Sequence, residues 1–416
     1  MAIGLVAAIV AGIAFRLIWI DDIEYKGDEA WMVDYVRAFW HTGTWSLVGM
    51  ISSAGPGLPH PGLGPWLFLA ISAFLPSAGP LELVRSIEAI NIITIILMVL
   101  FARYAVDRSE REPWLWAVAL MSVNPLAVIY SRKLWAMDTL PLFTLVMLCG
   151  WLYRDRRWGA FVWGLVGALL GQIHLTGFVF AASFLGVVLF FDRRSTRWLA
   201  WFAGSLLGAI PLLPWLVVIA EGIGPLNPAH FNNPIVPFGH WINFALGIDL
   251  FKALGDDFTS FLGFPKIGLY SSYLATLLLA GIVVIFAILM RRLIHQFHLD
   301  RRSTAALLLG TRTPTSLALD AGLIGYCALL AVMSQPTYLH YMIIALPLLA
   351  LWVAWIARVG AGPGPSMVSA RRLLAALVVA QAGVTMLFLA YIHQTQVIHG
   401  DYGTTYGSQR PAGLPR

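Results

Sequence analysis

Long apolar runs separated by short polar stretches recur along the whole sequence. A helix of about 20 apolar residues crosses the hydrocarbon core of a bilayer, and eleven runs approach or reach that length. The predicted spans are residues 2–20, 84–105, 113–131, 138–153, 158–175, 176–191, 198–220, 269–290, 317–333, 338–358 and 372–391. This pattern predicts an all-α polytopic membrane protein with about 11 transmembrane helices.

One further apolar stretch, residues 63–79, does not fit a full span. It is short and contains Gly64, Pro65 and Pro76, and proline interrupts a helix interior. We expect this stretch to lie in the membrane interface or to re-enter from one side. Residues 2–20 lack a basic start and a small-residue cleavage site, which favours a retained helix over a signal peptide.

Composition excludes several classes of protein. Apolar residues make up 59% of the 416 positions and charged residues 12%, with a mean hydropathy of +0.77. These values exclude a soluble globular chain and a disordered one, and the unbroken runs exclude a transmembrane β-barrel. The net charge of +6 includes no basic block interleaved with aromatics, so no nucleic-acid partner is expected. Cys149 and Cys327 lie inside apolar runs and indicate no disulfide.

The positions of the arginines predict how the chain is oriented in the membrane. Seventeen of the 27 basic residues fall in alternate loops, which the positive-inside rule places in the cytoplasm. These residues are Arg103, Arg108, Arg111, Arg154, Arg156, Arg157, Arg193, Arg194, Arg197, Arg291, Arg292, Arg301, Arg302, Arg312, Arg358, Arg371 and Arg372. The N-terminus is then inside and the C-terminus outside, with long outside loops at 21–83 and 221–268. We divide the chain into a module over 1–220, a cover loop over 221–268 and C-terminal helices with an outside tail over 269–416.

The first outside loop concentrates acidic residues just before a predicted helix. Residues 21–34 hold six of the 21 Asp and Glu residues. An apolar stripe follows at helical spacing, which predicts an amphipathic helix lying flat in the interface. The stripe consists of Trp31, Tyr35, Ala38 and Phe39.

Asp28 and Glu29 stand at the start of this helix, and two interpretations are open. Asp28 is either an N-cap, which accepts bonds from free backbone N–H groups, or a general base aimed at the membrane surface. Because neighbouring residues point to different sides of a helix, Glu29 would orient a cation or a hydroxyl rather than share the same atom.

Two other outside segments carry candidate binding groups. His60, between Pro59 and Pro61, is either a residue of an exposed turn or a hydrogen-bond donor to phosphate or sugar. The hairpin at 124–141 presents Tyr130, Arg132, Lys133 and Asp138. The outward cation pair either binds a lipid phosphate or contacts headgroups without a specific role. Asp138 is either a partner of Arg132 or the start of the next helix.

Further polar residues lie at the outside ends of predicted spans. His174, His340 and Tyr341 are of this kind, and each either makes a helix–helix hydrogen bond or belongs to a site. The outside loop 221–268 contains residues that could hold a divalent metal by type, but at spacings that fit no metal motif. They are His230, His240, Asp249, Asp256 and Asp257. No metal or other cofactor is expected.

Three ordered motifs resemble those of a known family. GDEAW follows the first span, HPG precedes the second apolar stretch, and YSRKLWAMD forms the next outside corner. Together they resemble the membrane-integral GT-C glycosyltransferases of the protein-mannosyltransferase-like and aminoarabinose-transferase-like set. The resemblance covers residues 1–195. Two positions depart from it, because Gly62 replaces a second proline and Trp31 replaces an arginine of the aminoarabinose group.

The resemblance implies an activity and residue roles. Such enzymes transfer a sugar from a polyprenyl-phosphate donor to an acceptor outside the cytoplasm. Asp28 matches the catalytic acid of the family, Glu29 its second carboxylate and His60 the histidine of its proline motif. Arg132 and Asp138 match its second corner. The donor, the lipid bilayer of the cell (inner) membrane and an acceptor of unknown kind (protein, lipid or glycan) are the implied partners.

The chemistry of such a transfer accounts for the residue types. Arg132 and Lys133 would neutralise the leaving phosphate, and Asp28 would accept the proton of the attacking hydroxyl. A one-step displacement inverts the anomeric centre. Spans 84–220 would bind the prenyl tail. A transporter or flippase of lipid-linked sugars is the alternative, although the acidic residues lie in outside loops and no repeat is visible.

Overall fold

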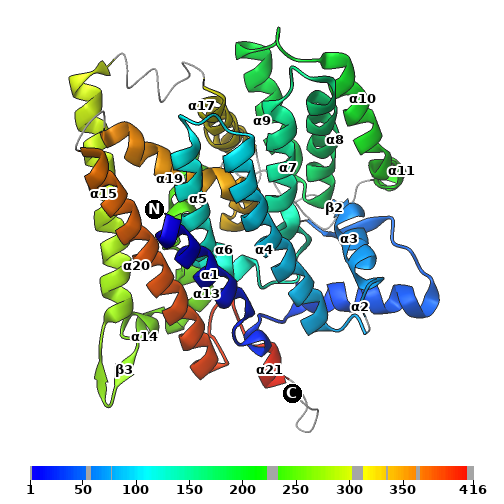
Figure 1. Cartoon of the computed structure of the whole chain (residues 1–416). Helices are drawn as coiled ribbons and strands as arrows, with labels where there is room; N and C mark the ends of the chain where they lie inside the picture. Colours follow the sequence, from blue (N-terminus) through cyan, green and yellow to red (C-terminus); the bar gives the residue numbers. More distant parts are fainter. Residues whose placement is uncertain are drawn as a thin grey trace.

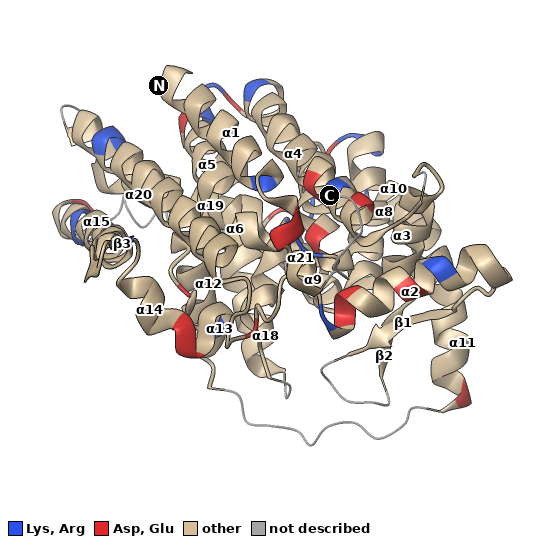
Figure 2. Ribbon diagram, turned by 90° about the horizontal axis from the view of Figure 1, so that it is seen from below, with Lys and Arg blue, Asp and Glu red and all other residues tan. Residues whose placement is uncertain are grey.

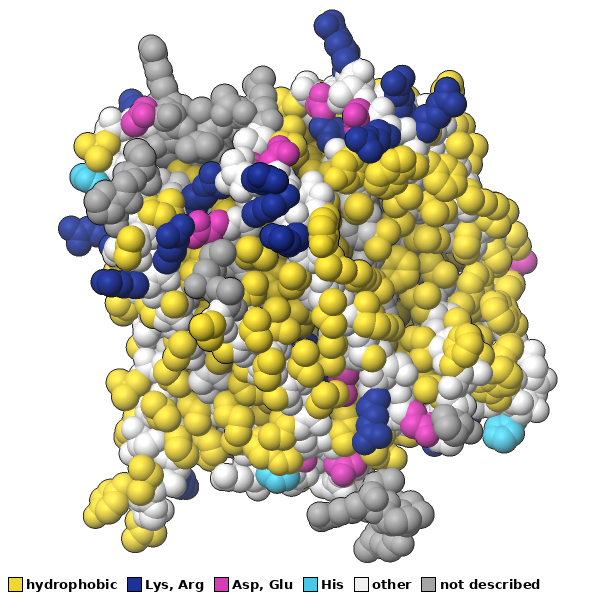
Figure 3. Space-filling view, in the orientation of Figure 1, with side chains coloured by type: hydrophobic (Ala, Val, Ile, Leu, Met, Phe, Trp, Pro, Cys, Tyr) yellow, Lys and Arg dark blue, Asp and Glu magenta, His cyan; other side chains and the backbone are white. Residues whose placement is uncertain are grey.

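The computed structural model describes residues 2–52, 58–75, 77–222, 233–301, 313–333, 336–361 and 366–409. Within these ranges the chain is a bundle of helices that run between two ends, and α2 (Gly27–Thr42) lies across the lower end (Figure 1). Figure 3 shows Lys and Arg side chains gathered over the upper part of the molecule. We call the lower end, from which the molecule is seen in Figure 2, the α2 end, and the upper end the arginine end.

Each predicted span coincides with a helical segment, which confirms the polytopic all-α class. Several segments are compound, because a proline, an asparagine, a short 3-10 turn or, at η5, a π-helical turn interrupts them. They are α1 (Ala2–Leu17), α4 (Pro80–Tyr104), α5 (Arg111–Val123) with α6 (Pro125–Tyr130), η2 (Ala136–Thr139) with α7 (Leu140–Leu152), α8 (Arg157–Ile173), α9 (Thr176–Phe191), α10 (Trp198–Ala209) with η3 (Ile210–Leu212) and α11 (Leu213–Glu221), α15 (Leu274–Leu299), α17 (Pro314–Leu319) with η5 (Asp320–Gly325) and α18 (Tyr326–Val332), η6 (Leu339–Ala345) with α19 (Leu346–Ala361), and α20 (Ser366–Thr395).

In the described part of the chain, six of these segments are long and apolar enough to cross a membrane by length and composition. The remaining elements lie between them. They are η1 (Ile20–Asp22), β1 (Val48–Ile51) paired antiparallel with β2 (Pro59–Pro61), α3 (Leu63–Ser72), α12 (Val236–Leu246), α13 (Phe251–Leu254), η4 (Gly255–Asp257), α14 (Phe258–Leu262), β3 (Lys266–Ile267) paired with β4 (Tyr270–Ser271), and α21 (Tyr406–Gln409).

The segment at 63–79 forms α3, whose 10 residues reach about 15 Å and cannot cross a bilayer. Phe68 and Leu69 of α3 are buried in one apolar cluster with Met32, Val33 and Val36 of α2. The two helices therefore pack together, and the placement of residues 63–79 in the interface or as a re-entrant segment stays a prediction.

The buried face of α2 differs in detail from the predicted stripe. Met32, Val33 and Val36 are buried, whereas Trp31 and Tyr35 flank that face. Ala38 is exposed and does not pack against the protein, so its predicted place in a membrane-facing stripe stays a prediction. Aliphatic side chains at i, i+1 and i+4 share a helix face just as well as aromatic ones, and those of α2 point toward α3 and α4.

A break between α5 and α6 shapes the corner at the α2 end. Asn124 Oδ1 accepts a hydrogen bond from the Ala127 backbone N–H at 3.1 Å, and Pro125 occupies the first helical position. This is a favourable helix start. Asn124 Nδ2 also donates to the Phe244 carbonyl at 3.0 Å. The break thus ties α12 to the corner that carries Tyr130.

The core surrounds α19, which is buried on nearly all of its sides. Polar side chains inside the bundle bond backbone carbonyls of neighbouring helices. Gln172 donates to Gly208 O at 2.6 Å and Thr385 to Val123 O at 2.7 Å. Such bonds join helices where lipid tails offer no polar partner.

Sidedness can be tested with single cysteines in a background without Cys149 and Cys327. Ser195 lies among the arginines of the α9–α10 loop, and Leu269, 98% exposed, lies in the β3–β4 hairpin at the α2 end. Because arginine-rich loops stay in the cytoplasm, a membrane-impermeant maleimide should label Leu269→Cys from outside and Ser195→Cys only from inside. Labelling of both from the same side contradicts this topology.

Candidate active site

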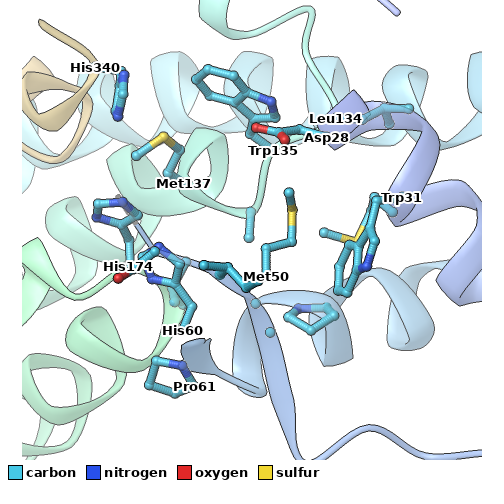
Figure 4. Close-up of a pocket in the computed structure, with 18 residues that line it drawn as sticks. Asp28, Trp31, Met50, His60, Pro61, Leu134, Trp135, Met137, His174 and His340 are labelled. Carbon is cyan, nitrogen blue, oxygen red and sulfur yellow. The ribbon is translucent and has the colours of Figure 1, made fainter. Parts of the chain in front are cut away.

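Two cavities lie close together at the α2 end. The first has a volume of about 340 Å³ and is lined by residues of α2, the β1–β2 pair, α3, the segment before α7, and the ends of α8 and η6. Its lining includes Asp28, Trp31, Met50, His60, Trp135, Met137, His174 and His340. Figure 4 shows the three histidines on one side of this space and Trp31 on the other, with the Asp28 carboxyl beside Trp135.

Asp28 enters this cavity from the first turn of α2. Lys26 is the N-cap residue, and its backbone N–H donates to Glu29 Oε2 at 3.2 Å. Glu29, rather than Asp28, therefore caps the helix start, and the N-cap interpretation of Asp28 was wrong. The free N–H groups and dipole of the helix stabilise an anion at the position of Asp28.

The surroundings of Asp28 adjust its acidity. Desolvation raises the pKa of this carboxyl, whereas the charges of Lys26 and Lys133 act in the opposite direction. A raised pKa makes a carboxylate a better proton acceptor at neutral pH. Asp28 thus has both the exposure and the basicity that a general base requires.

Glu29 occupies a different environment from its neighbour. Its side chain is fully buried and does not line the cavity. Burial, together with the charge of Glu24, raises the pKa of Glu29 to about 7. Its observed contact is the capping bond, so a direct contact between Glu29 and a substrate is not part of this geometry.

Three histidines from distant parts of the chain meet in the first cavity. His60 comes from β2, His174 ends α8 and His340 belongs to η6. The His60 and His174 ring centres are 4.7 Å apart, and those of His174 and His340 are 6.4 Å apart. The Tyr341 ring packs 5.4 Å from His174 without lining the cavity. The sequence predicted these residues separately, and the fold brings them together.

His60 offers a hydrogen-bonding atom to a ligand. Its Nδ1 atom is buried and has no hydrogen-bond partner among the described residues. Burial lowers the pKa of His60 to about 4, so the ring is neutral at pH 7. A neutral imidazole can donate one hydrogen bond and accept another, which suits sugar hydroxyls.

The second cavity, about 70 Å³, adjoins the first. Both are lined by Trp135 and His340, so these two side chains stand between them. The second cavity is also lined by Tyr130, Lys133, Lys26, Lys252, Glu24, Asp249, Asp401 and Tyr402. It therefore combines three lysines with three carboxylates.

Lys133 is the most enclosed cation of this second cavity. Its ammonium pairs with Glu24 and lies 4.3 Å from the centre of the Trp135 ring. Burial disfavours the charged form, but Glu24 and Glu29 outweigh it and raise the pKa of Lys133 overall. Lys133 therefore stays protonated. Glu24 also pairs with Lys26 at 2.7 Å, so its carboxylate lies between two ammonium groups.

Arg132 does not face either cavity. Its guanidinium donates to the Phe15 carbonyl at 3.0 Å and to the Trp19 carbonyl at 2.6 Å, and it lies 4.0 Å from Glu88. These are the carbonyl groups at the end of α1, where intrahelical partners run out. Arg132 therefore binds the end of α1 and lines neither cavity. Its predicted contact with the donor phosphate was wrong.

Asp138 is buried close to the second corner but lines neither cavity. It lies in η2, and its backbone carbonyl accepts a hydrogen bond from Asn91 at 3.0 Å. Its carboxyl oxygens have no hydrogen-bond partner among the described residues, and it makes no ion pair with Arg132. The predicted partnership with Arg132 was wrong, and the helix-start interpretation agrees with its position.

The described ranges contain no group of side chains arranged to bind a metal ion. No group of three His, Cys, Asp or Glu side chains there could hold one ion. Of the candidates in loop 221–268, His240 contacts the Thr337 carbonyl and Asp249 accepts a bond from Asn243. His230 lies outside the described residues.

Several lining residues were missed by sequence reasoning. Trp135 lines both cavities. It lies within the YSRKLWAMD motif, but its sequence position does not distinguish it from an ordinary tryptophan of the membrane interface. Asp401 and Tyr402 come from beyond the last span. Sequence carries no signal for their approach, because a contact across almost 380 residues depends on the tertiary fold.

Comparison with known proteins gives structural but not sequence relatives. No family model matches the sequence, and no curated protein matches it. A crystal structure of ArnT from Cupriavidus metallidurans bound to undecaprenyl phosphate matches with a TM-score of 0.54 and 13% identity, over 94% of this chain and 76% of that one.

The chain has the GT-C fold.

A second solved GT-C structure, the apo oligosaccharyltransferase of Archaeoglobus fulgidus, matches at a TM-score of 0.46 and 14% identity, over 92% of this chain and 55% of that one. That similarity is too low to argue from. The GT-C fold confirms the architecture that the motif resemblance implied. Residue roles rest on the two cavities described above, because identities of this size establish the fold alone.

The role of Arg132 can be tested by stability. Arg132→Ala leaves the carbonyls of Phe15 and Trp19 without their donor and Glu88 without its neighbouring charge, and removing one partner of such a buried group costs about 3 kcal/mol or more. The melting temperature of the purified protein should fall by several degrees. Arg85→Ala is the matched control, because Arg85 is exposed on α4. Equal melting temperatures for the two variants contradict this role.

Proposed function

We propose that this protein is an inverting glycosyltransferase that transfers a sugar from a polyprenyl-phosphate donor to an acceptor hydroxyl. The observation that carries the proposal is the shared wall between the two cavities. A carboxylate, Asp28, lies on one side of Trp135 and His340, and an ammonium group, Lys133, lies on the other. A transfer of this type needs a proton acceptor and a phosphate-binding cation on opposite sides of one sugar carbon.

The reaction follows from this placement. The acceptor oxygen attacks C1 of the sugar while its proton passes to the Asp28 carboxylate. The bond between C1 and the phosphate oxygen breaks, and the phosphate leaves with the electron pair. Attack and departure on opposite faces of C1 invert its configuration, by the same logic that governs glycosidases.

Lys133 supports the departure of the phosphate. A donor phosphodiester carries one negative charge, and the ammonium groups of Lys26 and Lys133 share a single carboxylate, that of Glu24. An ammonium group that is already desolvated interacts strongly with developing negative charge. Lys252, paired with Asp401 at 3.3 Å, adds a second cation at the rim of the same cavity.

The first cavity suits the sugar. Its volume of about 340 Å³ falls within the usual range of small-ligand pockets. His60 provides neutral hydrogen-bonding capacity, and Trp31 and Trp135 provide aromatic faces. A hexose or a pentose meets these demands equally well, and the acceptor is a protein, a lipid or a glycan.

The proposed site faces the outside of the cell membrane. It lies at the α2 end, away from the arginine-rich loops that the positive-inside rule retains in the cytoplasm. A polyprenyl donor held in the outer leaflet reaches such a site from the side. No nucleotide is then needed as the donor.

Transport of a lipid-linked sugar is less well supported. Transporters place ionisable residues along a path near mid-bilayer. The buried Arg16 and Glu88 line neither cavity, and Arg16 donates to the carbonyls of Gly12 and Ser122 at 2.8 Å. Their observed contacts are helix–helix contacts.

The base role predicts the effect of one substitution. Asp28→Asn removes the proton acceptor without changing shape, so turnover should fall by about a hundredfold or more. The assay is release of polyprenyl phosphate from a panel of polyprenyl-phosphate hexoses and pentoses in the presence of membrane acceptors. Asp34→Asn, exposed on the same helix, is the matched control and should keep wild-type turnover. Wild-type turnover by Asp28→Asn removes this residue from the mechanism.

The pH dependence follows from the same role. Asp28 accepts a proton only when it is ionised, and its pKa lies above the ordinary 3.8. We expect kcat/KM to rise with pH through the raised pKa of Asp28 and to level off once Asp28 is ionised. The Glu29→Gln variant should keep this acid limb, because Glu29 titrates separately at about 7. A rate that falls as pH rises through this range contradicts the base role.

A further inference from the structure

The segment after α20 folds back onto the loop that carries Asp28. Residues 396–409 follow the end of α20 and run beside residues 19–26, and α21 contacts η1. Figure 1 shows α21 next to the first loop at the α2 end. The two partners are separated by nearly the whole chain, so their contact belongs to the tertiary structure.

Backbone bonds join the two segments edge to edge. Glu24 and Thr405 form an antiparallel bridge, and the Tyr406 backbone N–H donates to Ile23 O at 3.0 Å. Gln409 Nε2 donates to the Tyr25 carbonyl at 2.7 Å. The segment therefore acts like a strand added to the edge of the loop.

Asp22 receives side chains from this region on three of its oxygens. Its carboxylate accepts from Gln396 Nε2 at 2.9 Å and contacts His393 Nδ1 at 2.7 Å. Its backbone carbonyl accepts from the Tyr402 hydroxyl at 2.5 Å. Asp22 and Tyr402 are both buried, so the bond between them forms away from competing water.

The same segment reaches the second cavity. Lys26 Nζ donates to the Asp401 carbonyl, and both Asp401 and Tyr402 line the cavity with Lys133. The contacts thus fix residues 22–26, the part of the chain that immediately precedes α2. Asp28 lies only two residues beyond Lys26.

We propose that residues 396–409 are a positioning element of the active site, which sets the location of Asp28 relative to Lys133 by binding residues 22–26. This proposal rests on the proposed function, in which both residues act on one sugar carbon. A displacement of about 1 Å at a reacting group can cost about a hundredfold in rate. Without the segment, residues 22–26 would lose their main tertiary hydrogen bonds while the α2–α3 cluster stayed packed.

Truncation tests whether residues 396–409 hold residues 22–26 in place. A chain that ends at Thr395 should show faster amide hydrogen exchange over residues 22–30 in detergent or nanodiscs, with exchange of α19 unchanged. A chain that lacks only residues 410–416 is the matched control and should exchange like the wild type. Unchanged exchange over residues 22–30 in the longer truncation overturns the proposal.

A single-atom change tests the link to catalysis. Tyr402→Phe removes the bond to the Asp22 carbonyl but keeps the ring in its packing against Phe388. The loss of one hydrogen bond predicts a fall in kcat of about threefold to tenfold, with the donor KM within about twofold of wild type. Tyr391→Phe is the matched control, because Tyr391 is equally buried but points to the Asp257 carbonyl.

The two proposals fail in different ways. A wild-type chain that transfers no sugar from any donor contradicts the proposed function, whatever the exchange result. If the wild type transfers sugar but Tyr402→Phe and the longer truncation keep its kcat, the enzyme proposal stands and the positioning proposal is wrong. Faster exchange together with a lower kcat and an unchanged donor KM supports the positioning role.

Discussion

The buried carboxylate of Glu24, held between the ammonium groups of Lys26 and Lys133, is the interaction on which the site depends. Glu24 is 1% exposed, and a carboxylate at such a position is tolerated only when cations and hydrogen bonds compensate its lost hydration. Lys26 leads into α2, Lys133 belongs to the corner after α6, and Thr405 of the C-terminal segment bridges Glu24 through the backbone. Three distant parts of the chain therefore converge on one charge.

The rest of the bundle keeps this convergence in place. Arg132 binds the carbonyls at the end of α1 directly beside Lys133 in sequence, so the corner cannot shift without moving α1. Asn124 fixes the other side of the corner to α12. The apolar cluster shared by α2 and α3 fixes the position of α2 against the rest of the bundle. Helix packing thus places the Asp28 carboxyl and the Lys133 ammonium in two adjoining cavities that share Trp135.

The sequence predicts the fold much better than it predicts the contacts of single residues. Apolar runs and arginine loops locate the spans because burial in lipid makes strong demands on composition. Asp28, His60, His174, His340 and Lys133 were predicted because polar groups gather in the segments expected outside, and the fold brings them to two adjoining cavities. Arg132 was misassigned because a cation at a corner looks the same whether it binds phosphate or helix carbonyls. Asp401 and Tyr402 were missed because long-range docking of a polar tail leaves no periodic signal.

We propose that a lipid phosphate and a sugar occupy adjoining spaces on the two sides of Trp135 and His340. A cryo-EM map of the protein in nanodiscs with undecaprenyl phosphate tests this most directly. The account predicts phosphate density within hydrogen-bonding distance of Lys133 Nζ, with the prenyl chain leaving toward the bilayer and the space beside Asp28 still open. Phosphate density at the arginine end, or in the cavity beside Asp28 with Lys133 not in contact, would contradict it.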